Sequence, residues 1–294
     1  MGKMYTRIAK RNNVDFPVNI EYYDSANAVA DDCKARKITD SSFTDYSKDY
    51  NICGGWAGCQ TYSEALGYLR NGYEPAVEQL EREYRLNAKG GEQKRISFKN
   101  DIMGYQPVVP LAMQGIPNSM VNMTMKTIKT KVVDIYYDIT ANAGVSSSKI
   151  LKCGTNILGV ILDLEKQGYR FNLYSIQTYN DSQDCDCLIV KVKDARQPLD
   201  LKRMSFSVCH TGFFRIIGFD WYSRNPNSRY RSGYGTELSR TLNDEDLDNF
   251  NRVVFGDNAV VLRADRLVYK DSDADCKKYI QGVLTNVRKR KEVS

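Results

Sequence analysis

The alternation of apolar and polar residues marks an α/β unit in the second half of the chain. The run from Val132 to Tyr137 is rich in β-branched and aromatic residues, and it leads through a polar turn into a long helical pattern from Ser146 to Gln167. A buried strand, a polar turn and a helix form the opening unit of an open α/β sheet. Further strands are predicted at Arg170–Gln177, Leu188–Val192, Phe219–Tyr222 and Asn258–Leu262, and a closing helix at Asp271–Lys289. Charged Lys191 and Lys193 favour an edge position for the strand at 188–192.

The first 130 residues predict a different organisation. Helical spacing recurs at 25–37, 61–72 and 74–86, and Thr61 with Glu64 forms a capping arrangement, so we expect a mainly helical region over residues 1–100. Prolines at 107, 110 and 117 prevent a continuous helix in the Pro- and Met-rich stretch 101–130. We expect that stretch to be an extended connector packed over a surface. Residues 131–294 would then form a mostly parallel α/β sheet flanked by helices.

The composition indicates which class of protein this is, but it does not indicate an activity. No apolar run approaches the roughly 18 residues that span a bilayer, so no membrane partner is expected. The first residues lack the apolar segment of a secretory signal, which indicates a cytoplasmic protein whose eight cysteines are reduced. The net charge of +6 permits an acidic partner without requiring one, and the 20 tyrosines suit interaction surfaces.

The turn after the first predicted strand of the α/β unit holds the sharpest candidate for chemistry. Asp138, Thr140 and Asn142 alternate along it, so their oxygens would point into one crevice at the carboxyl end of the strand. Hard cations such as Mg²⁺ prefer oxygen ligands of this kind. The pattern is compatible with a magnesium site and also with a polar turn that binds no cofactor, which is the favoured interpretation.

The order of strand, polar turn, long helix, strand and edge strand resembles a von Willebrand factor A domain. That resemblance implies a Rossmann-type sheet and a metal-ion-dependent adhesion site with the motif D-x-S-x-S. Asp138 and Thr140 match the motif, whereas Asn142 departs from it because it carries no hydroxyl. The more distant Thr and Asp ligands of that family have no clear counterparts here.

A second resemblance extends over residues 55–235. Segments such as Gly55-Trp-Ala-Gly58, Gly104-Tyr-Gln-Pro107 and Phe213-Phe-Arg-Ile-Ile-Gly-Phe219 are similar to uncharacterised proteins encoded by tailed bacteriophages and prophages. The resemblance implies a location in the cytoplasm of an infected bacterium or in the virion, and it implies no activity.

Arginines and tyrosines are interleaved between residues 222 and 240. Arginine makes bidentate contacts to phosphate and tyrosine stacks on bases, so this loop is a candidate nucleic-acid or phosphate site. Its candidate residues are Arg224, Arg229, Tyr230, Arg231, Tyr234 and Arg240. A solvated loop whose tyrosines pack back on the sheet is the favoured alternative. His210 is the only histidine, which excludes a site built from several imidazoles.

These patterns together favour a non-enzymatic protein-interaction or assembly protein. Its A-like domain would present the turn at Asp138 to a protein partner or to a second copy, as a virion component or as a binder of a host (defence) protein. The alternatives are a nucleic-acid-binding protein using loop 222–240 and a Mg²⁺-dependent enzyme centred on Asp138.

Overall fold

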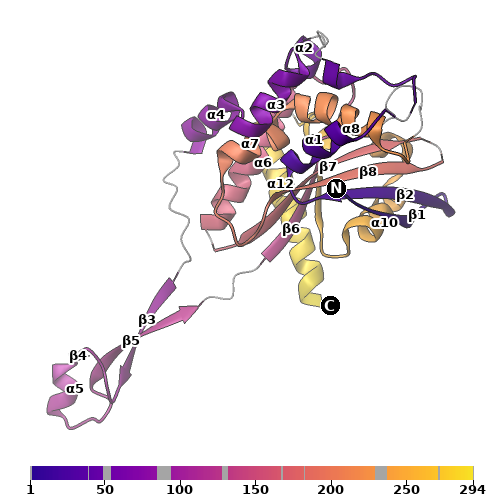
Figure 1. The fold of residues 1–294 in the computed structure, drawn as a ribbon. Helices are drawn as coiled ribbons and strands as arrows, with labels where there is room; N and C mark the ends of the chain where they lie inside the picture. The colour runs from indigo at the N-terminus through magenta and orange to yellow at the C-terminus, as the bar shows by residue number, and fades with distance from the viewer. Residues whose placement is uncertain are drawn as a thin grey trace.

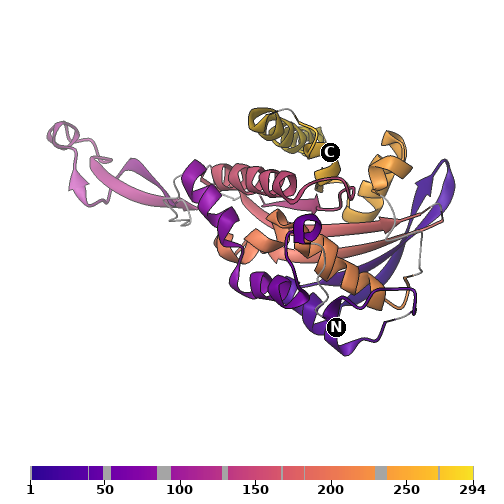
Figure 2. The same ribbon diagram turned by 90° about the horizontal axis from the view of Figure 1, so that it is seen from above.

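The computed structural model describes residues 2–38, 40–48, 54–84, 94–127, 132–166, 168–181, 183–228, 237–270 and 272–293. Within these ranges, one six-stranded sheet with helices on its two faces forms the main body of the protein (Figures 1 and 2). A smaller, three-stranded sheet stands away from that body (Figure 1). The described residues include no helix that is both long and apolar enough to cross a membrane.

The main sheet has the strand order β1-β2-β8-β7-β6-β9. Its strands are β1 (Lys3–Arg11), β2 (Val14–Tyr23), β6 (Val132–Asp138), β7 (Arg170–Asn180), β8 (Cys185–Lys193) and β9 (Val260–Arg263). The pairs β2–β8, β6–β7 and β6–β9 are parallel, whereas β1–β2 and β7–β8 are antiparallel. The predicted α/β class is therefore confirmed, and β6 lies inside the sheet. The sheet is mixed, however, and only partly parallel.

The N-terminal hairpin departs most from the predicted organisation, because residues 3–23 are strands of the main sheet and not helices. The hairpin turns at Asn12 and Asn13, which both have positive φ, as a two-residue hairpin turn requires. β2 pairs with β8, so β8 is an inner strand and the predicted edge position is wrong. Lys193 is buried there because its Nζ lies 2.8 Å from Glu165 Oε1, which compensates its charge.

The helices build two cores of unequal size on the two faces of the sheet (Figure 2). The smaller core lies under α9 (Leu238–Thr241) and α10 (Asp244–Phe255). The larger core lies on the opposite face and includes residues of α1 (Ala26–Ala35), η1 (Tyr46–Lys48), α2 (Gly54–Ala57), α3 (Tyr62–Asn71), α4 (Glu74–Tyr84), α6 (Ser147–Lys166), α7 (Leu201–Cys209), η2 (Phe213–Gly218), α8 (Phe219–Arg224), α11 (Ala264–Leu267) and α12 (Asp273–Val293).

Two local features of the larger core bear on the predictions. The strand expected at Phe219–Tyr222 is helix α8, and all of its residues are buried, so its apolar run reflects a helix enclosed on every side. Helices α6 and α7 approach closely at Gly154, where a Cβ would collide with the carbonyl oxygen of Val208. The seven described cysteines are all buried.

The smaller sheet comprises β3 (Lys94–Asp101), β4 (Gln106–Pro107) and β5 (Met120–Thr127), with α5 (Val109–Met113) between β4 and β5. We call residues 94–127 the arm. Its strands β3 and β5 pair antiparallel over their whole length. The extended connector predicted for 101–130 is thus a folded hairpin in its described part. Pro107 ends β4 and Pro110 lies in the first turn of α5, where proline is tolerated.

Candidate functional site

The predicted site at Asp138 is a closed polar corner at the carboxyl end of β6. Asp138 Oδ2 accepts hydrogen bonds from Arg263 Nη1 at 2.6 Å and from Thr178 Oγ1 at 3.2 Å. The backbone N–H of Thr140 donates to Asp138 Oδ1 at 3.1 Å. Asp138 is only 3% exposed. Both carboxylate oxygens therefore have partners within the protein, and the guanidinium of Arg263 supplies the positive charge.

The other two residues of the predicted site do not complete an open crevice. Thr140 is buried, and its Oγ1 accepts a hydrogen bond from the Thr178 backbone N–H at 2.9 Å. Asn142 is half-buried, and its Oδ1 accepts from the Gly144 backbone N–H at 2.9 Å. The expectation that this turn forms the centre of an exposed contact face is therefore wrong for Asp138 and Thr140. The magnesium site stays a prediction that this geometry does not favour, because a cation would have to displace Arg263.

The ion pair of Asp138 also connects the sheet to a helix. Arg263 ends β9 and donates through Nη2 to Asn251 Oδ1 of α10 at 2.7 Å. Burial raises the pKa of Asp138 to about 6, and the positive charge of Arg263 opposes that rise. Such a buried, compensated pair holds β6, β9 and α10 together, which is a structural role.

The turn that follows Asp138 is fixed by a second arginine. Arg215, in the π-helical segment η2, is 1% exposed and donates through Nη2 to the carbonyl oxygens of Asn142 and Val145, at 2.9 and 2.8 Å. Its Nη1 donates to the carbonyl oxygen of Trp56, and its guanidinium lies 4.8 Å from the centre of the Trp56 ring. Trp56 Nε1 in turn donates to the Ala143 carbonyl oxygen at 3.1 Å. Burial lowers the pKa of Arg215 to about 10, which leaves it charged at neutral pH.

The predicted Arg/Tyr site is only partly within the described residues. Arg229, Tyr230, Arg231 and Tyr234 lie in 229–236, outside them. Arg224 is buried, and its guanidinium contacts Asp220 Oδ1 at 2.9 Å and Asp45 Oδ1 at 2.6 Å, so it is not available to a phosphate. Arg240 is exposed, 3.9 Å from Glu237 Oε2. The structure therefore corrects the role predicted for Arg224.

His210 lies in a buried aromatic cluster. Its ring meets Tyr73 edge-on at 4.4 Å and stacks on Phe206 at 5.1 Å, and its Nδ1 accepts from the Gly212 backbone N–H at 2.9 Å. Burial lowers the pKa of His210 to about 4, so the imidazole is neutral near pH 7. Burial raises the pKa of the nearby Cys59 thiol to about 12, which keeps it protonated and a poor nucleophile. This arrangement is a packed core.

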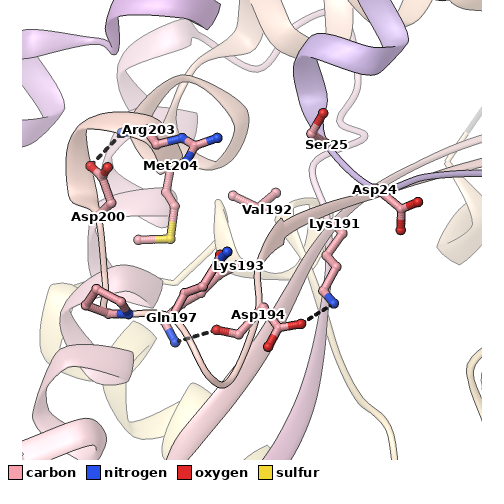
Figure 3. A pocket seen from close by; sticks show the side chains of 11 residues that line it. Asp24, Ser25, Lys191, Val192, Lys193, Asp194, Gln197, Asp200, Arg203 and Met204 are labelled. Carbon is pink, nitrogen blue, oxygen red and sulfur yellow. Dashed lines mark hydrogen bonds and ion pairs between the residues drawn. The ribbon is translucent and has the colours of Figure 1, made fainter.

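A cavity of about 230 Å³ opens beyond the carboxyl ends of the parallel neighbours β2 and β8 (Figure 3). Ser25, the N-cap of α1, and Arg203 and Met204 near the start of α7 also border it, an arrangement in which α/β proteins often bind ligands. Its charges are largely matched, however, since Lys191 Nζ lies 2.6 Å from Asp194 Oδ2 and Lys193 pairs with Glu165. The lining residues are Asp24, Ser25, Lys191, Val192, Lys193, Asp194, Gln197, Pro198, Asp200, Arg203 and Met204.

The arm carries the largest concentration of exposed apolar side chains in the described chain. Met113 is 85% exposed and Met103 is 78% exposed. Others in the arm are Phe98, Ile102, Tyr105, Val109, Ile116 and Met123. Residues 102–125 include no charged residue. Met103, Gly104, Tyr105, Asn122 and Met123 line a hollow there, so the arm is the candidate functional surface.

The chain was compared with known protein families. The model of a family described as "Domain of unknown function (DUF7192)" matches residues 9–284. The chain belongs to the DUF7192 family. The match begins near the end of β1, spans the other strands of the main sheet and the arm, and ends within α12, so DUF7192 covers both parts of the molecule. No curated protein and no solved structure matches this DUF7192 chain.

The sequence pattern of this DUF7192 chain did not predict the two arginines that contact the corner at Asp138 and the turn after it. Arg263 lies 125 residues after Asp138, and Arg215 lies 73 residues after Asn142. Nothing in the neighbourhood of either arginine marks its partner. The one available signal for Arg215 was its setting, a single charge inside the apolar run Phe213-Phe-Arg-Ile-Ile217.

Proposed function

We propose that this protein is a non-enzymatic protein-interaction or assembly protein, and that the arm is its contact surface. The observation that carries the proposal is the exposure of uncharged apolar side chains on a segment that stands away from the main body. Exposed apolar surface of this extent is unfavourable in water and is typical of a binding site. Methionines suit such a surface because their flexible side chains adapt to the shape of a partner.

The free edges of the arm favour a protein partner over a lipid surface. Strand β3 pairs only with β5 among the described residues, and β4 covers β5 only at Met120 and Val121. The remaining edges present backbone N–H and C=O groups that need hydrogen-bond partners. A bilayer interior offers none, whereas a strand or polar side chains of another protein do.

The charge of the arm indicates the chemistry of that partner. Lys94, Arg95, Lys99 and Lys126 are basic, against the single acid Asp101. The whole chain is also positive, with a net charge of +6. A second copy would therefore bring like charges together, and we propose a different protein with an apolar groove rimmed by acidic side chains.

The finer fold is part of the same proposal. The strand order β8-β7-β6-β9, the position of α6 between β6 and β7, and Asp138 at the end of β6 support a von Willebrand A-like core. The hairpin β1–β2 beyond β8 departs from the edge position expected for β8. The setting in an infected bacterium, in the virion or bound to a host (defence) protein, rests on the sequence resemblance alone.

Site-specific cross-linking tests the proposal. A photoreactive phenylalanine analogue replaces Tyr105 on the arm or, as a matched control, exposed Tyr269 on the main body. We expect Tyr105 to cross-link to one protein, identified by mass spectrometry, and Tyr269 not to do so. The purified partner should bind the wild-type chain and lose at least about tenfold in affinity with Met103→Ser and Met113→Ser combined.

Measurements at increasing salt and with lipid vesicles distinguish an acidic protein partner from a membrane surface. Binding that weakens as salt increases would support an acidic partner. Cross-links only between copies of this chain would overturn the choice of a different protein. Equal cross-linking from Tyr105 and Tyr269, or binding of anionic vesicles that depends on Met103 and Met113, would overturn the proposed arm–protein contact.

A further inference from the structure

A row of tyrosines lies on the face of the main sheet that carries α9 and α10, on the part of that face that these helices leave uncovered. Phe16, Val18 and Ile20 of β2 lie in the smaller core, under α9 and α10, and Tyr22 continues the same side of that strand. Tyr174 of β7 and Tyr136 of β6 lie beside each other in the sheet register and, like Tyr22, are only partly buried. Tyr5 of β1, on the same face, is 40% exposed. The cover of this face ends at Phe255, the last residue of α10.

The rings of this row form a stack that is open at one point. Tyr136 and Tyr174 are stacked, with centroids 4.5 Å apart and planes inclined by 10°, and Phe255 adjoins Tyr136 at 4.5 Å. Between Tyr174 and Tyr22 the separation widens to 6.4 Å and the planes diverge by 55°. Stacked bases lie about 3.4 Å apart, so a base held between two rings needs about 7 Å. The separation of Tyr22 and Tyr174 is close to that spacing, and the Tyr22 ring must turn toward the plane of Tyr174 to hold a base.

Positive charge borders the open end of the row. On the side of β1 that carries Tyr5, the strand has the basic residues Lys3, Arg7 and Arg11, and β1 has no acidic residue. Lys3 Nζ lies 5.7 Å from the centre of the Tyr22 ring, and the Arg7 guanidinium lies 5.7 Å from that of Tyr5. Arg7 has no ion-pair partner in the part of the chain that the structure describes. Burial raises the pKa of each of the four tyrosines, so their hydroxyls are neutral and do not repel an anion.

Acidic groups near the row are partly compensated. Asp24 lies 3.8 Å from Lys3, and Asp194 pairs with Lys191 and Arg196. Asp134, at the β6 end, accepts a hydrogen bond from Asn172 and has no cationic partner among the described residues. The charge therefore changes from basic at β1 to acidic at β6. The phosphates of a bound nucleic acid would accordingly lie on the β1 side of the row.

We propose that this face binds single-stranded nucleic acid, with a base between Tyr22 and Tyr174 and the phosphates along Arg7 and Lys3 of β1. Stacking on aromatic rings beside a basic strand is how sheet surfaces hold single strands without a fixed sequence. Paired bases in a duplex are already stacked on each other, so the site selects unpaired ones. This activity is separate from the protein contact proposed for the arm.

Binding of labelled oligonucleotides to the full chain, measured by fluorescence anisotropy, tests the proposal. We expect oligothymidylate or oligouridylate to bind, and the matching duplex to bind at least about tenfold more weakly. Tyr22→Ala combined with Tyr174→Ala should weaken binding at least about tenfold, because each stacked base contributes a factor of roughly 5 to 150. Tyr22→Phe with Tyr174→Phe should bind like the wild type, since the rings remain.

Charge variants and matched controls complete the experiment. Arg7→Ala should weaken binding and reduce its dependence on salt, whereas Arg70→Ala, on α3, should change neither. Tyr269→Ala is the control for loss of an exposed tyrosine. No binding by the wild type, equal binding of duplex, or equal losses in the controls would overturn the proposal. If the double alanine variant fails to fold, Tyr5→Ala and Arg7→Ala decide by the same criteria.

Discussion

Arg263 and Asp138 form a buried ion pair between two parallel strands, with Nη1 2.6 Å from Oδ2 and side chains 6% and 4% exposed. The pair occupies the corner where the sequence predicts a cation site. Its guanidinium and the Thr140 and Thr178 donors together satisfy both carboxylate oxygens. The polar residues of this corner therefore connect β6, β9 and α10.

Removal of Arg263 should destabilise the protein strongly. Arg263→Ala leaves the Asp138 carboxylate buried without its cation, and breaking a buried pair in this way costs about 3 to 5 kcal/mol. Urea unfolding at pH 8 measures the change in the free energy of unfolding. Arg266→Ala is the matched control, because its partner Asp244 is 94% exposed and a surface pair contributes less than about 1 kcal/mol. Similar losses for the two variants would contradict a structural role for the Asp138 pair.

The penalty of Arg263→Ala should depend on pH with a defined sign. Burial already raises the pKa of Asp138 to about 6, and loss of Arg263 raises it further. A raised carboxyl pKa means that the folded state holds a proton that the unfolded state releases, so stability falls as pH rises above about 4. The variant should therefore be closest to the wild type at about pH 4 and furthest from it at pH 8. A penalty that is constant over this range would contradict the assignment.

Sequence pattern predicted the fold where spacing is local and periodic. Strand β6 and helix α6 lie within a residue or two of their expected limits, because one is rich in β-branched and aromatic residues and the other has a sustained helical period. The hairpin β1–β2 is not predicted: Phe16, Val18 and Ile20 alternate and face the core, but Pro17 between them argues against a strand because proline lacks a backbone N–H. Periodicity cannot show that the apolar residues around Met113 remain exposed, since their composition equals that of a core segment.

The candidate site shows the same limit for contacts between distant residues. Asp138 and Thr140 do come together, because alternate positions after a strand lie close in any fold. Their burial follows from Arg263 and Thr178, which reach the corner from β9 and β7. The register between neighbouring strands decides those contacts, and that register cannot be predicted from a single sequence.

The buried imidazole of His210 should make the protein sensitive to acid. Burial lowers its pKa from 6.5 to about 4, so between these values the unfolded state binds a proton that the folded state does not. Stability from this group is full above about pH 6.5 and is lost as pH falls through 4, by roughly 3 kcal/mol in total. Because His210 is the only histidine, its single imidazole signal in an NMR titration reports this directly. A midpoint near 6.5 would contradict its burial.

Loss of Arg215 should release the turn that follows Asp138. Arg215→Met removes the donors to the carbonyl oxygens of Trp56, Asn142 and Val145, and we expect destabilisation of about 2 to 4 kcal/mol. Hydrogen exchange should become faster in peptides covering 140–146, because the turn loses its anchor. Arg203→Met, on the exposed side of α7, is the control and should change stability by less than about 0.5 kcal/mol. Unchanged exchange in the turn would show that Trp56 holds it without the arginine.

The contact between α6 and α7 should reverse the usual effect of replacing glycine by alanine in a helix. An alanine normally stabilises a helix interior by about 1 kcal/mol, and Gly67→Ala in α3 should do so because nothing lies within 4 Å of its added Cβ. The same methyl at Gly154 collides with the Val208 carbonyl oxygen and Cys209, which are backbone and buried groups that cannot move aside. We expect Gly154→Ala to destabilise by about 1 to 3 kcal/mol, as overpacking does. Urea midpoints at constant slope compare the two variants, and a gain in stability from Gly154→Ala would mean that α6 and α7 lie further apart than described.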